Sequence, residues 1–325
     1  MNAGSKAVDV MMLGSMRALV AEQLAQHFTF HQTPDAADQD AFFSAVGPRI
    51  RGLATGGHGR VDGTVMDRLP RLEIIANFGV GYDTVDAAEA GRRGIVLTNT
   101  PDVLTEEVAD LAIGLMLAAI RQLPQADRYL RQGKWLERPF PLTATLRGRK
   151  VGVLGLGRIG KAIARRLEAF GLEIAYHSRN PQADVPYRYY PTLAGMAHDV
   201  HVLMAVAPGG PGTKHLVNAE VLQALGRDGV LVNVGRGSVV DEQALIAALK
   251  AGTTLTAGLD VFEDEPRVPP ELIALDHVVL LPHVGSGSHH TRDAMGQLVV
   301  DNLVSWFAGK GPLTPVAETP WRSPT

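Results

Sequence analysis

Three side chains suited to acid–base and anion chemistry follow separate apolar segments in the second half of the sequence: Arg236, Glu265 and His283. Each follows an expected buried strand, and parallel strands bring their carboxyl ends to one edge of a sheet. Arginine can bind a carboxylate through two hydrogen bonds. Histidine exchanges a proton near neutral pH, and a carboxylate orients its ring and favours its protonated form. The set fits reduction of a 2-oxo acid, with Arg236 as clamp, His283 as proton donor and Glu265 as its partner.

Such a reduction also needs a hydride donor, and a glycine pattern predicts where a nicotinamide dinucleotide would bind. Gly155-Leu156-Gly157-Arg158-Ile159-Gly160 stands between an expected strand at 150–154 and an expected helix at 161–170. Gly155 would allow a tight turn, Gly157 would let the backbone approach a pyrophosphate, and Gly160 would let helix and strand pack closely. The alternative is a tight turn between strand and helix that binds no ligand.

The residues after the next expected strand, 172–176, indicate which dinucleotide is preferred. An NAD enzyme places an acidic residue there to bind the ribose 2′-hydroxyl. This chain has His177-Ser178-Arg179-Asn180, with no acid. Ser178 can donate a hydrogen bond, and Arg179 can pair with a 2′-phosphate. We therefore expect NADP(H) to be preferred, with NAD(H) possible; the alternative is that Arg179 is a solvated loop charge.

The rest of the chain alternates strands and helices, which predicts an α/β fold with parallel sheets covered on both faces. Glycine-containing loops at 55–60 and 78–83 follow expected strands at 50–54 and 72–77, where ligands bind in open sheets. The sequence places a domain boundary near Pro101, where a long helix follows. It also predicts a hinge at 284–289 and a last helix that stops near Gly309, followed by an extended or frayed tail.

Two further segments have a structural expectation. Asp241 and Glu242 look like the cap and the first-turn acid of a helix at 242–250. Trp135 stands alone in a polar stretch, 126–147, with scattered prolines. A tryptophan in that setting either anchors local packing or covers a site in a neighbouring subunit.

The length, charge and cysteine content of the chain exclude several classes of protein. The 325 residues suggest about two domains, and 46% hydrophobic with 20% charged residues is ordinary for a globular protein. The net charge of −3, without a long basic block, argues against a nucleic-acid partner. The absence of cysteine excludes disulfides, zinc–thiolate sites and thiol catalysis, and fits a cytoplasmic protein. We expect no signal peptide, and the longest apolar run, 111–120, is too short to span a membrane.

At its chemical motifs the sequence resembles the D-isomer-specific 2-hydroxyacid dehydrogenases, over nearly the whole chain. The most specific segments are the glycine pattern at 155–160, Asn233-Val-Gly-Arg-Gly-Ser-Val-Val-Asp-Glu242, Gly258-Leu-Asp-Val-Phe-Glu-Asp-Glu-Pro266 and Leu281-Pro-His283. The resemblance implies two Rossmann-like or flavodoxin-like doubly wound domains with a cleft between them. It implies a discontinuous substrate domain, 1–100 plus 289–325, and an NAD(P)-binding domain at 101–288.

The resemblance also implies roles for individual residues. Arg236 would clamp the substrate, His283 would donate the proton and Glu265 would orient His283. Asp260 and the backbone near Val234 would hold the nicotinamide carboxamide, and Thr105 would lie beside the cofactor. The further residues expected at the cofactor are Ala207, Pro208 and Thr213. The residues expected at the substrate carboxylate are Gly56, Gly57, Val80 and Gly81.

Within the family the sequence is most similar to the glyoxylate/hydroxypyruvate reductase branch, with hydroxyphenylpyruvate reductase as a near relative. Residues 78–83 and the triplet 178–180 carry this similarity. The resemblance implies a homodimer in which Trp135 reaches the partner's active site. Glu265 separates the chain from formate dehydrogenases, which carry glutamine there. Residues 208–213 depart from the Pro-x-Thr-x-x-Thr form, which leaves the adenine-side contacts open.

Two other classes of protein are alternatives to a dehydrogenase. A cofactor-sensing binding protein of the corepressor type could share the fold, but the complete set of catalytic side chains argues against it. A hydrolase or metalloenzyme would need a G-x-S-x-G, H-E-x-x-H or P-loop motif, and the sequence has none of them. The pair His289-His290 is too sparse to predict a metal site.

Overall fold

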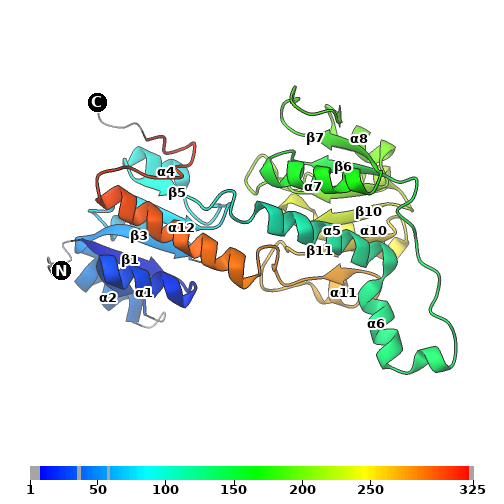
Figure 1. The fold of residues 1–325 in the computed structure, drawn as a ribbon, viewed down its shortest axis with the longest axis horizontal. Helices are drawn as coiled ribbons and strands as arrows, with labels where there is room; N and C mark the ends of the chain where they lie inside the picture. The colour runs from blue at the N-terminus through cyan, green and yellow to red at the C-terminus, as the bar shows by residue number, and fades with distance from the viewer. Residues whose placement is uncertain (1–7, 35–37, 57–58, 322–325) are drawn as a thin grey trace. The chain divides into compact units, whose positions relative to one another are not determined.

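The computed structural model describes residues 8–34, 38–56 and 59–321. The chain divides into two compact units (Figure 1): unit 1 is Met1–Leu104 with Ser288–Thr325, and unit 2 is Thr105–Gly287. The sequence placed a boundary near Pro101, and the structure divides between Leu104 and Thr105. Each unit contains one parallel sheet, which confirms the predicted α/β class.

The sheet of unit 1 has the strand order β2-β1-β3-β4-β5. Its strands are β1 (Asp9–Leu13), β2 (Thr29–Gln32), β3 (Ile50–Gly56), β4 (Ile74–Phe78) and β5 (Val96–Thr98). The sequence did not predict β2, because this edge strand reads Thr-Phe-His-Gln and has no apolar run. The other four strands lie within a few residues of their expected positions, because each contains a continuous apolar segment.

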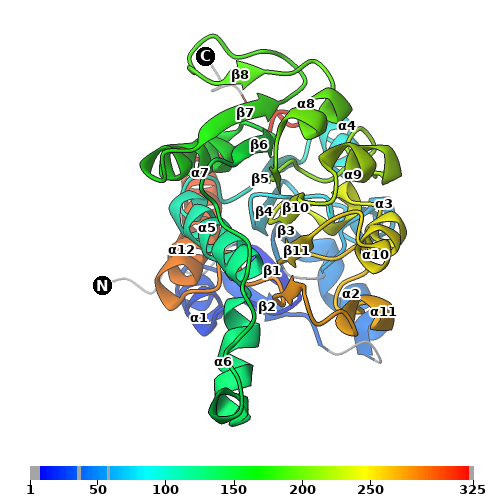
Figure 2. The ribbon, with the colours of Figure 1, turned by 90° about the vertical axis from the view of Figure 1, so that its right-hand side faces the viewer.

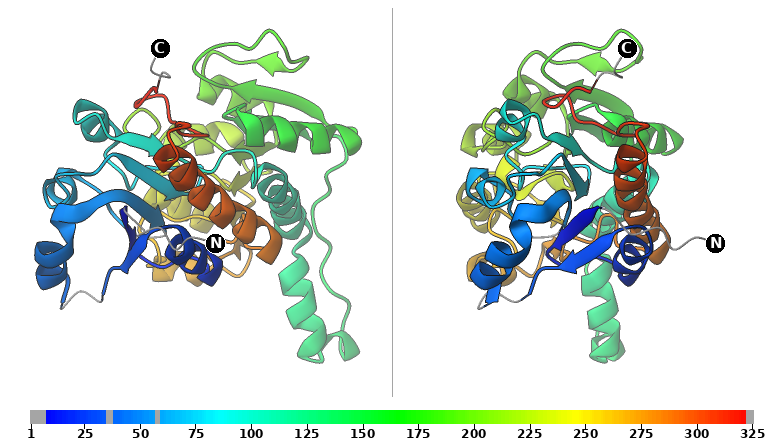
Figure 3. Two further views of the ribbon diagram at one scale, coloured as in Figure 1. Left: turned by 60° about the vertical axis from the view of Figure 1, so that its left-hand side comes forward. Right: turned by 90° about the vertical axis from the view of Figure 1, so that its left-hand side faces the viewer.

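Helices cover both faces of this sheet (Figure 3). One face packs against α1 (Ala18–His27) and α12 (His289–Phe307), and the other against α2 (Gln39–Val46), α3 (Gly63–Asp67) and α4 (Ala87–Arg92). Successive strand residues point to opposite faces. Val10 and Met12 accordingly join the α1/α12 core, whereas Met11 joins the other core. Because α12 comes from the end of the chain, two distant segments build one hydrophobic core.

The sheet of unit 2 has the order β12-β11-β10-β9-β6-β7-β8. Its strands are β6 (Lys150–Leu154), β7 (Glu173–His177), β8 (Arg188–Tyr189), β9 (Val202–Ala205), β10 (Val230–Asn233), β11 (Thr256–Leu259) and β12 (Val279–Leu280). The chain moves outward from β6 to β8 and then returns to β9. Strand order therefore reverses between β6 and β9, which is where open parallel sheets bind their ligands.

Two groups of helices enclose the sheet of unit 2 (Figure 2). Helices α5 (Thr105–Arg121) and α7 (Arg158–Ala169) pack together on one face. Helices α8 (Leu193–Asp199), α9 (Ala219–Leu225) and α10 (Glu242–Ala251) cover the other, and α11 (Pro270–Ile273) precedes β12. Asp241 caps α10 as predicted, because its side chain accepts a hydrogen bond from the Ala244 N–H.

A helical arm within 123–147 was not predicted as a helix. Helix α6 (Leu123–Arg131) and the short turn η3 (Lys134–Leu136) contain no buried residue, and α6 projects from the body of unit 2 (Figures 1 and 2). Trp135 is 66% exposed, so it does not anchor packing in its own chain. The exposed apolar side chains of the arm are Leu123, Leu130, Trp135, Leu136 and Leu142. Of the helices the structure describes, none has the length and apolar character needed to cross a bilayer.

The tail was expected to be extended or frayed, and for the described residues up to 321 the second alternative is wrong. Pro315 forms an antiparallel bridge with Thr98, and the Val316 N–H donates to Leu97 O at 2.9 Å. The Asn302 side chain, 1% exposed, accepts hydrogen bonds from the backbone of the following segment, Leu313 and Thr314. The tail is ordered because a buried polar side chain and a sheet edge provide partners for its backbone.

Candidate active site

The structure brings His283 and Glu265 into direct contact. His283 Nδ1 lies 2.7 Å from Glu265 Oε2, and the two side chains are 44% and 23% exposed. The second carboxylate oxygen, Oε1, accepts a hydrogen bond from the Phe262 N–H at 3.0 Å. Nothing among the described residues bonds to the other ring nitrogen, Nε2. An imidazole held through Nδ1 can therefore deliver a proton from Nε2.

Glu265 is kept ionised by its surroundings. Burial alone would raise the pKa of Glu265, but the hydrogen bond from His283 and its positive charge lower it. The Phe262 N–H and the charge of Arg236 lower it further, and the net pKa lies below the ordinary glutamate value. The turn of Arg236 also lies against this loop, because a Cβ on the next residue, Gly237, would lie 1.8 Å from the Phe262 carbonyl carbon.

Arg236 is positioned by Asn233, which was not predicted from the sequence as a functional residue. Asn233, 1% exposed at the end of β10, donates through Nδ2 to Arg236 O at 2.9 Å. Its Oδ1 accepts from the Gly235 N–H at 3.1 Å. Asn233 therefore fixes the turn that carries Arg236 through the N–H of Gly235 and the carbonyl of Arg236. The feature of the sequence that could have indicated this role is an asparagine at the end of an otherwise apolar strand.

Asp260 fastens the segment that follows His283. Its two carboxylate oxygens accept hydrogen bonds from the Val284 and Gly285 N–H groups, each at 2.7 Å. The residue is 1% exposed. Burial raises its pKa, and the two backbone hydrogen bonds oppose that rise. In this structure Asp260 thus supports the loop of His283, and its expected contact with a nicotinamide carboxamide stays a prediction.

The glycine pattern follows β6 directly, and its three glycines have different surroundings. Gly155 has φ +96°, and a Cβ there would lie 3.0 Å from the Ala207 backbone. A Cβ on Gly160 would lie 2.2 Å from Gly155 O. A Cβ on Gly157 would meet nothing within 4 Å, and its φ is −79°. Packing within the fold explains why Gly155 and Gly160 are glycines. It does not explain Gly157, whose open side fits a ligand that approaches the backbone.

The turn after β7 presents an arginine to solvent. Arg179 is exposed, and no carboxylate among the described residues pairs with it. The Ser178 hydroxyl donates to Asn180 O at 2.7 Å, so it stabilises the turn itself. The loop after β9 is also internally bonded: Thr213 Oγ1 donates to Pro208 O at 2.7 Å. The contacts of Ser178, Asn180 and Thr213 with a cofactor stay predictions.

Three further residues expected at the cofactor, Ala207, Val234 and Thr105, lie at the ends of strands or at the start of a helix. Ala207, 4% exposed, follows β9 and packs against the glycine turn. The Val234 N–H donates to Ala205 O at 3.1 Å, beyond the end of β10. Thr105 is the first residue of α5.

In unit 1 the turn after β4 exposes unpaired backbone donors. Asn77 Nδ2 donates to Gly79 O and Gly81 O, and Asn99 Nδ2 donates to Val80 O at 2.9 Å. No acceptor among the described residues bonds to the N–H groups of Val80 and Gly81. Two such donors suit a carboxylate. Asn77 and Asn99, whose side-chain amides fix this turn, were not predicted from the sequence as functional residues.

The other carboxylate candidates in unit 1 are at the end of β3. Gly56 is its last residue, and a Cβ there would lie 2.9 Å from the Phe78 side chain, so packing requires glycine. Gly57 lies outside the described residues.

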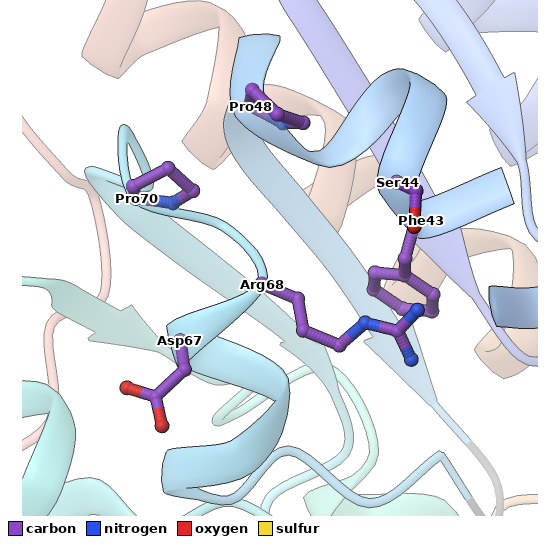
Figure 4. A pocket seen from close by; sticks show the side chains of 6 residues that line it. All are labelled: Phe43, Ser44, Pro48, Asp67, Arg68 and Pro70. Atoms are coloured by element: carbon purple, nitrogen blue, oxygen red, sulfur yellow. The ribbon is translucent and has the colours of Figure 1, made fainter. Parts of the chain in front are cut away.

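A surface pocket of about 270 Å³ lies elsewhere in unit 1 (Figure 4). It is lined by Phe43, Ser44, Pro48, Asp67, Arg68 and Pro70. Arg68 lies over the Phe43 ring at 4.3 Å and pairs with Asp40 at 2.8 Å. None of the candidate catalytic residues lines this pocket, and its arginine is already used in packing.

Comparison with known proteins decides the family. The model of the D-isomer specific 2-hydroxyacid dehydrogenase NAD binding domain matches residues 113–285. The chain belongs to this family. It is an NAD(P)-dependent oxidoreductase of the glyoxylate/hydroxypyruvate reductase branch, as its motifs predicted.

Several relatives support this membership of the 2-hydroxyacid dehydrogenases. Glyoxylate/hydroxypyruvate reductase A of Arabidopsis thaliana is 46% identical over 311 residues, 96% of this chain and 99% of the relative. Hydroxyphenylpyruvate reductase of Plectranthus scutellarioides is 44% identical over the same shares of the two chains. A solved NADPH-dependent glyoxylate/hydroxypyruvate reductase from Sinorhizobium meliloti, in complex with NADP and malonate, is 53% identical. It matches with a TM-score of 0.93, over 98% of this chain and 99% of that one.

Proposed function

We propose that this dehydrogenase uses NADPH in preference to NADH to reduce small 2-oxo acids, such as glyoxylate and hydroxypyruvate, to D-2-hydroxy acids. The observation that carries the proposal is the His283–Glu265 contact, which leaves Nε2 without a partner among the described residues. The turn that carries Arg236 packs against the loop of Glu265. The alternative within the family is reduction of hydroxyphenylpyruvate.

Each of the three catalytic side chains is proposed to have a separate role in the reduction. Bound NADPH supplies the hydride. Glu265 holds Nδ1–H of His283, so that Nε2 carries the proton given to the developing alkoxide oxygen. Arg236 binds the substrate carboxylate and polarises the neighbouring carbonyl. The N–H groups of Val80 and Gly81, with the segment Gly56–Gly57, are proposed as further ligands of the carboxylate.

The residues around the glycine turn fit a dinucleotide, because Gly157 is open where no packing requires glycine. The pyrophosphate is proposed to bind at the start of α7, where backbone N–H groups attract anions. Arg179, Ser178 and Asn180 are proposed to hold the 2′-phosphate. The other proposed cofactor ligands are Thr105, Leu156, Arg158, Ile159, Ala207, Pro208, Thr213, Val234 and Asp260.

Arg179→Asp is expected to lower kcat/KM with NADPH by at least about tenfold and to leave NADH almost unaffected. The new carboxylate repels the 2′-phosphate, whereas NADH has no such group. Initial rates with each cofactor measure the ratio. Arg227→Asp is the matched control, because it makes the same charge change at an exposed residue before β10, at the other end of the strands. An unchanged cofactor ratio in Arg179→Asp would show that Arg179 does not touch the phosphate.

A substrate panel tests the proposed reaction. NADPH and NADH oxidation is measured with glyoxylate, hydroxypyruvate, hydroxyphenylpyruvate and pyruvate in parallel. We expect the highest kcat/KM with NADPH and the two small oxo acids, glyoxylate and hydroxypyruvate. Turnover with hydroxyphenylpyruvate alone would select the alternative substrate. Tight NADPH binding without turnover of any acid would instead support a cofactor-sensing protein.

We also propose that the chain forms a homodimer and that the arm at 123–147 contributes to the interface. The arm exposes leucines that are 52% to 100% accessible, together with Trp135, and apolar side chains gathered in this way mark protein contacts. Sedimentation analysis is expected to give twice the chain mass, and Leu136→Asp is expected to shift it toward the monomer. Leu313→Asp is the matched control, because Leu313 is also exposed but lies outside the arm. A monomeric unaltered chain would contradict the proposal.

A further inference from the structure

The loop that carries Glu265 is in contact with the turn that carries Arg236. A Cβ built on Gly237 would lie 1.8 Å from the Phe262 carbonyl carbon and 2.4 Å from Glu263 N. No side chain can occupy that space without moving the backbone. The glycine next to Arg236 therefore packs directly against the peptide group between Phe262 and Glu263, three residues before Glu265.

A buried carboxylate holds the same peptide group. Glu242 Oε1 accepts a hydrogen bond from the Glu263 N–H at 2.8 Å, and the residue is 7% exposed. Burial raises the pKa of Glu242; the hydrogen bond opposes the rise, and the charges of Glu263, Asp264 and Glu265 add to it. An acid in this position is costly unless its oxygens are used. Among the described residues, the backbone N–H that bonds to this carboxylate belongs to the loop of Glu265.

The neighbouring acids are already paired with other groups. Glu263 Oε1 contacts His215 Nε2 at 2.7 Å, and Asp264 pairs with Arg267 at 2.8 Å. Glu265 contacts His283. Three of the four acids therefore meet a basic side chain, whereas Glu242 meets the backbone.

These contacts form a continuous path to the proton donor. Glu242 holds the Glu263 N–H, and the Phe262 N–H on the same short segment holds Glu265 Oε1. Glu265 Oε2 in turn holds His283. A shift of this segment would move the carboxylate that orients the imidazole.

We propose that Glu242 and Gly237 are positioning residues, which hold the Phe262–Glu263 peptide group so that Glu265 meets His283 beside Arg236. This inference rests on the proposed function of those three side chains. It gives Glu242 a part in the reaction beyond its place in the first turn of α10.

The test compares variants that keep or remove the acceptor oxygen of Glu242. Glu242→Gln keeps an oxygen for the Glu263 N–H and is expected to retain kcat within about threefold. Glu242→Leu removes it and is expected to lower kcat about 10- to 100-fold, because small displacements of reacting groups cost rates of this order. The NADPH dissociation constant is expected to change less than about twofold.

The pH profile separates positioning from a merely structural role. A displaced Glu265 favours the protonated imidazole less, so the reduction rate of Glu242→Leu is expected to decline at lower pH than that of the unaltered chain. Gly237→Ala is expected to show the same shift. Glu220→Leu is the matched control: Glu220 is an exposed acid in the first turn of α9 and has no contact with this loop.

Specific outcomes would overturn the inference. An unshifted pH profile in both Glu242→Leu and Gly237→Ala, or a Glu242→Gln variant as slow as Glu242→Leu, would do so. Where Glu242→Leu does not fold, as judged by NADPH binding, the smaller Glu242→Ala decides. Glu265→Gln in the same assays distinguishes failure of this inference from failure of the proposed function. If Glu265→Gln leaves rate and profile unchanged, the proposed function fails; if it alters both while the Glu242 and Gly237 variants do not, only this inference fails.

Discussion

His283→Ala is expected to lower kcat for glyoxylate reduction by about 10²- to 10⁴-fold while NADPH binding stays within about twofold of the unaltered value. The reason is the loss of the proton donor at Nε2, since positioned acid catalysis contributes effects of this size. Steady-state rates and fluorescence titration with NADPH measure the two quantities. A near-normal rate would remove His283 from the reaction.

Its matched control is His198→Ala, which removes an exposed histidine at the end of α8 that also contacts a carboxylate, Asp199. That variant is expected to keep the normal rate. Glu265→Gln is expected to fall between the two, because the amide still orients the ring but no longer favours its charged form.

The pH dependence follows from the protonation states required. Reduction needs a proton on His283 and oxidation of the hydroxy acid needs its absence, so the rate of reduction is expected to fall and that of oxidation to rise as the pH increases. The pKa of Glu265 is lowered, with burial outweighed by His283, the Phe262 N–H and Arg236. Its ionised form therefore persists below the ordinary glutamate pKa of about 4.3. Its contribution to folding stability is present above that value and is lost as pH falls through the lowered pKa.

Arg236→Ala is expected to lower kcat/KM by about 10²- to 10³-fold, with a higher KM for the 2-oxo acid and little change in NADPH binding. The guanidinium both binds the carboxylate and stabilises charge on the carbonyl oxygen, and removal of one such donor has an effect of this order. Arg236→Lys is expected to recover little, because an ammonium cannot make two parallel hydrogen bonds. Full activity in the lysine variant would show that charge alone is needed.

Asn233→Ala is the companion measurement for Arg236. The asparagine holds the backbone of the arginine turn at Gly235 and Arg236, so a smaller loss of kcat/KM is expected in this variant. An effect on NADPH binding alone would instead place Asn233 with the cofactor.

Much of the fold could be predicted because its strands are buried on both faces. Strands β6 and β10 read as short continuous apolar runs, and a run of that kind between turn residues is typical of a parallel sheet. The elements that were missed lack this signal. Strand β2 is a half-exposed edge, and α6 has no buried residue, so neither has an apolar pattern facing a core of its own chain.

The three candidate catalytic side chains could be predicted from the sequence because each follows an apolar segment that forms a strand. The residues that position them could not. Gly237 requires glycine only because the 262–263 peptide group lies against it, and Glu242 reads as an ordinary first-turn acid until its contact with Glu263 is seen. Contacts between loops far apart in sequence arise only on folding, and no local pattern contains them.

The discontinuous core of unit 1 has a consequence for the nascent chain. Val299, Val300 and Leu303 of α12 complete a core begun by Val10 and Met12. During synthesis, every residue of unit 2 leaves the ribosome before α12 does. Unit 2 can therefore fold while one apolar face of the first sheet is still uncovered. Until the last helix emerges, this uncovered apolar face is exposed to aggregation.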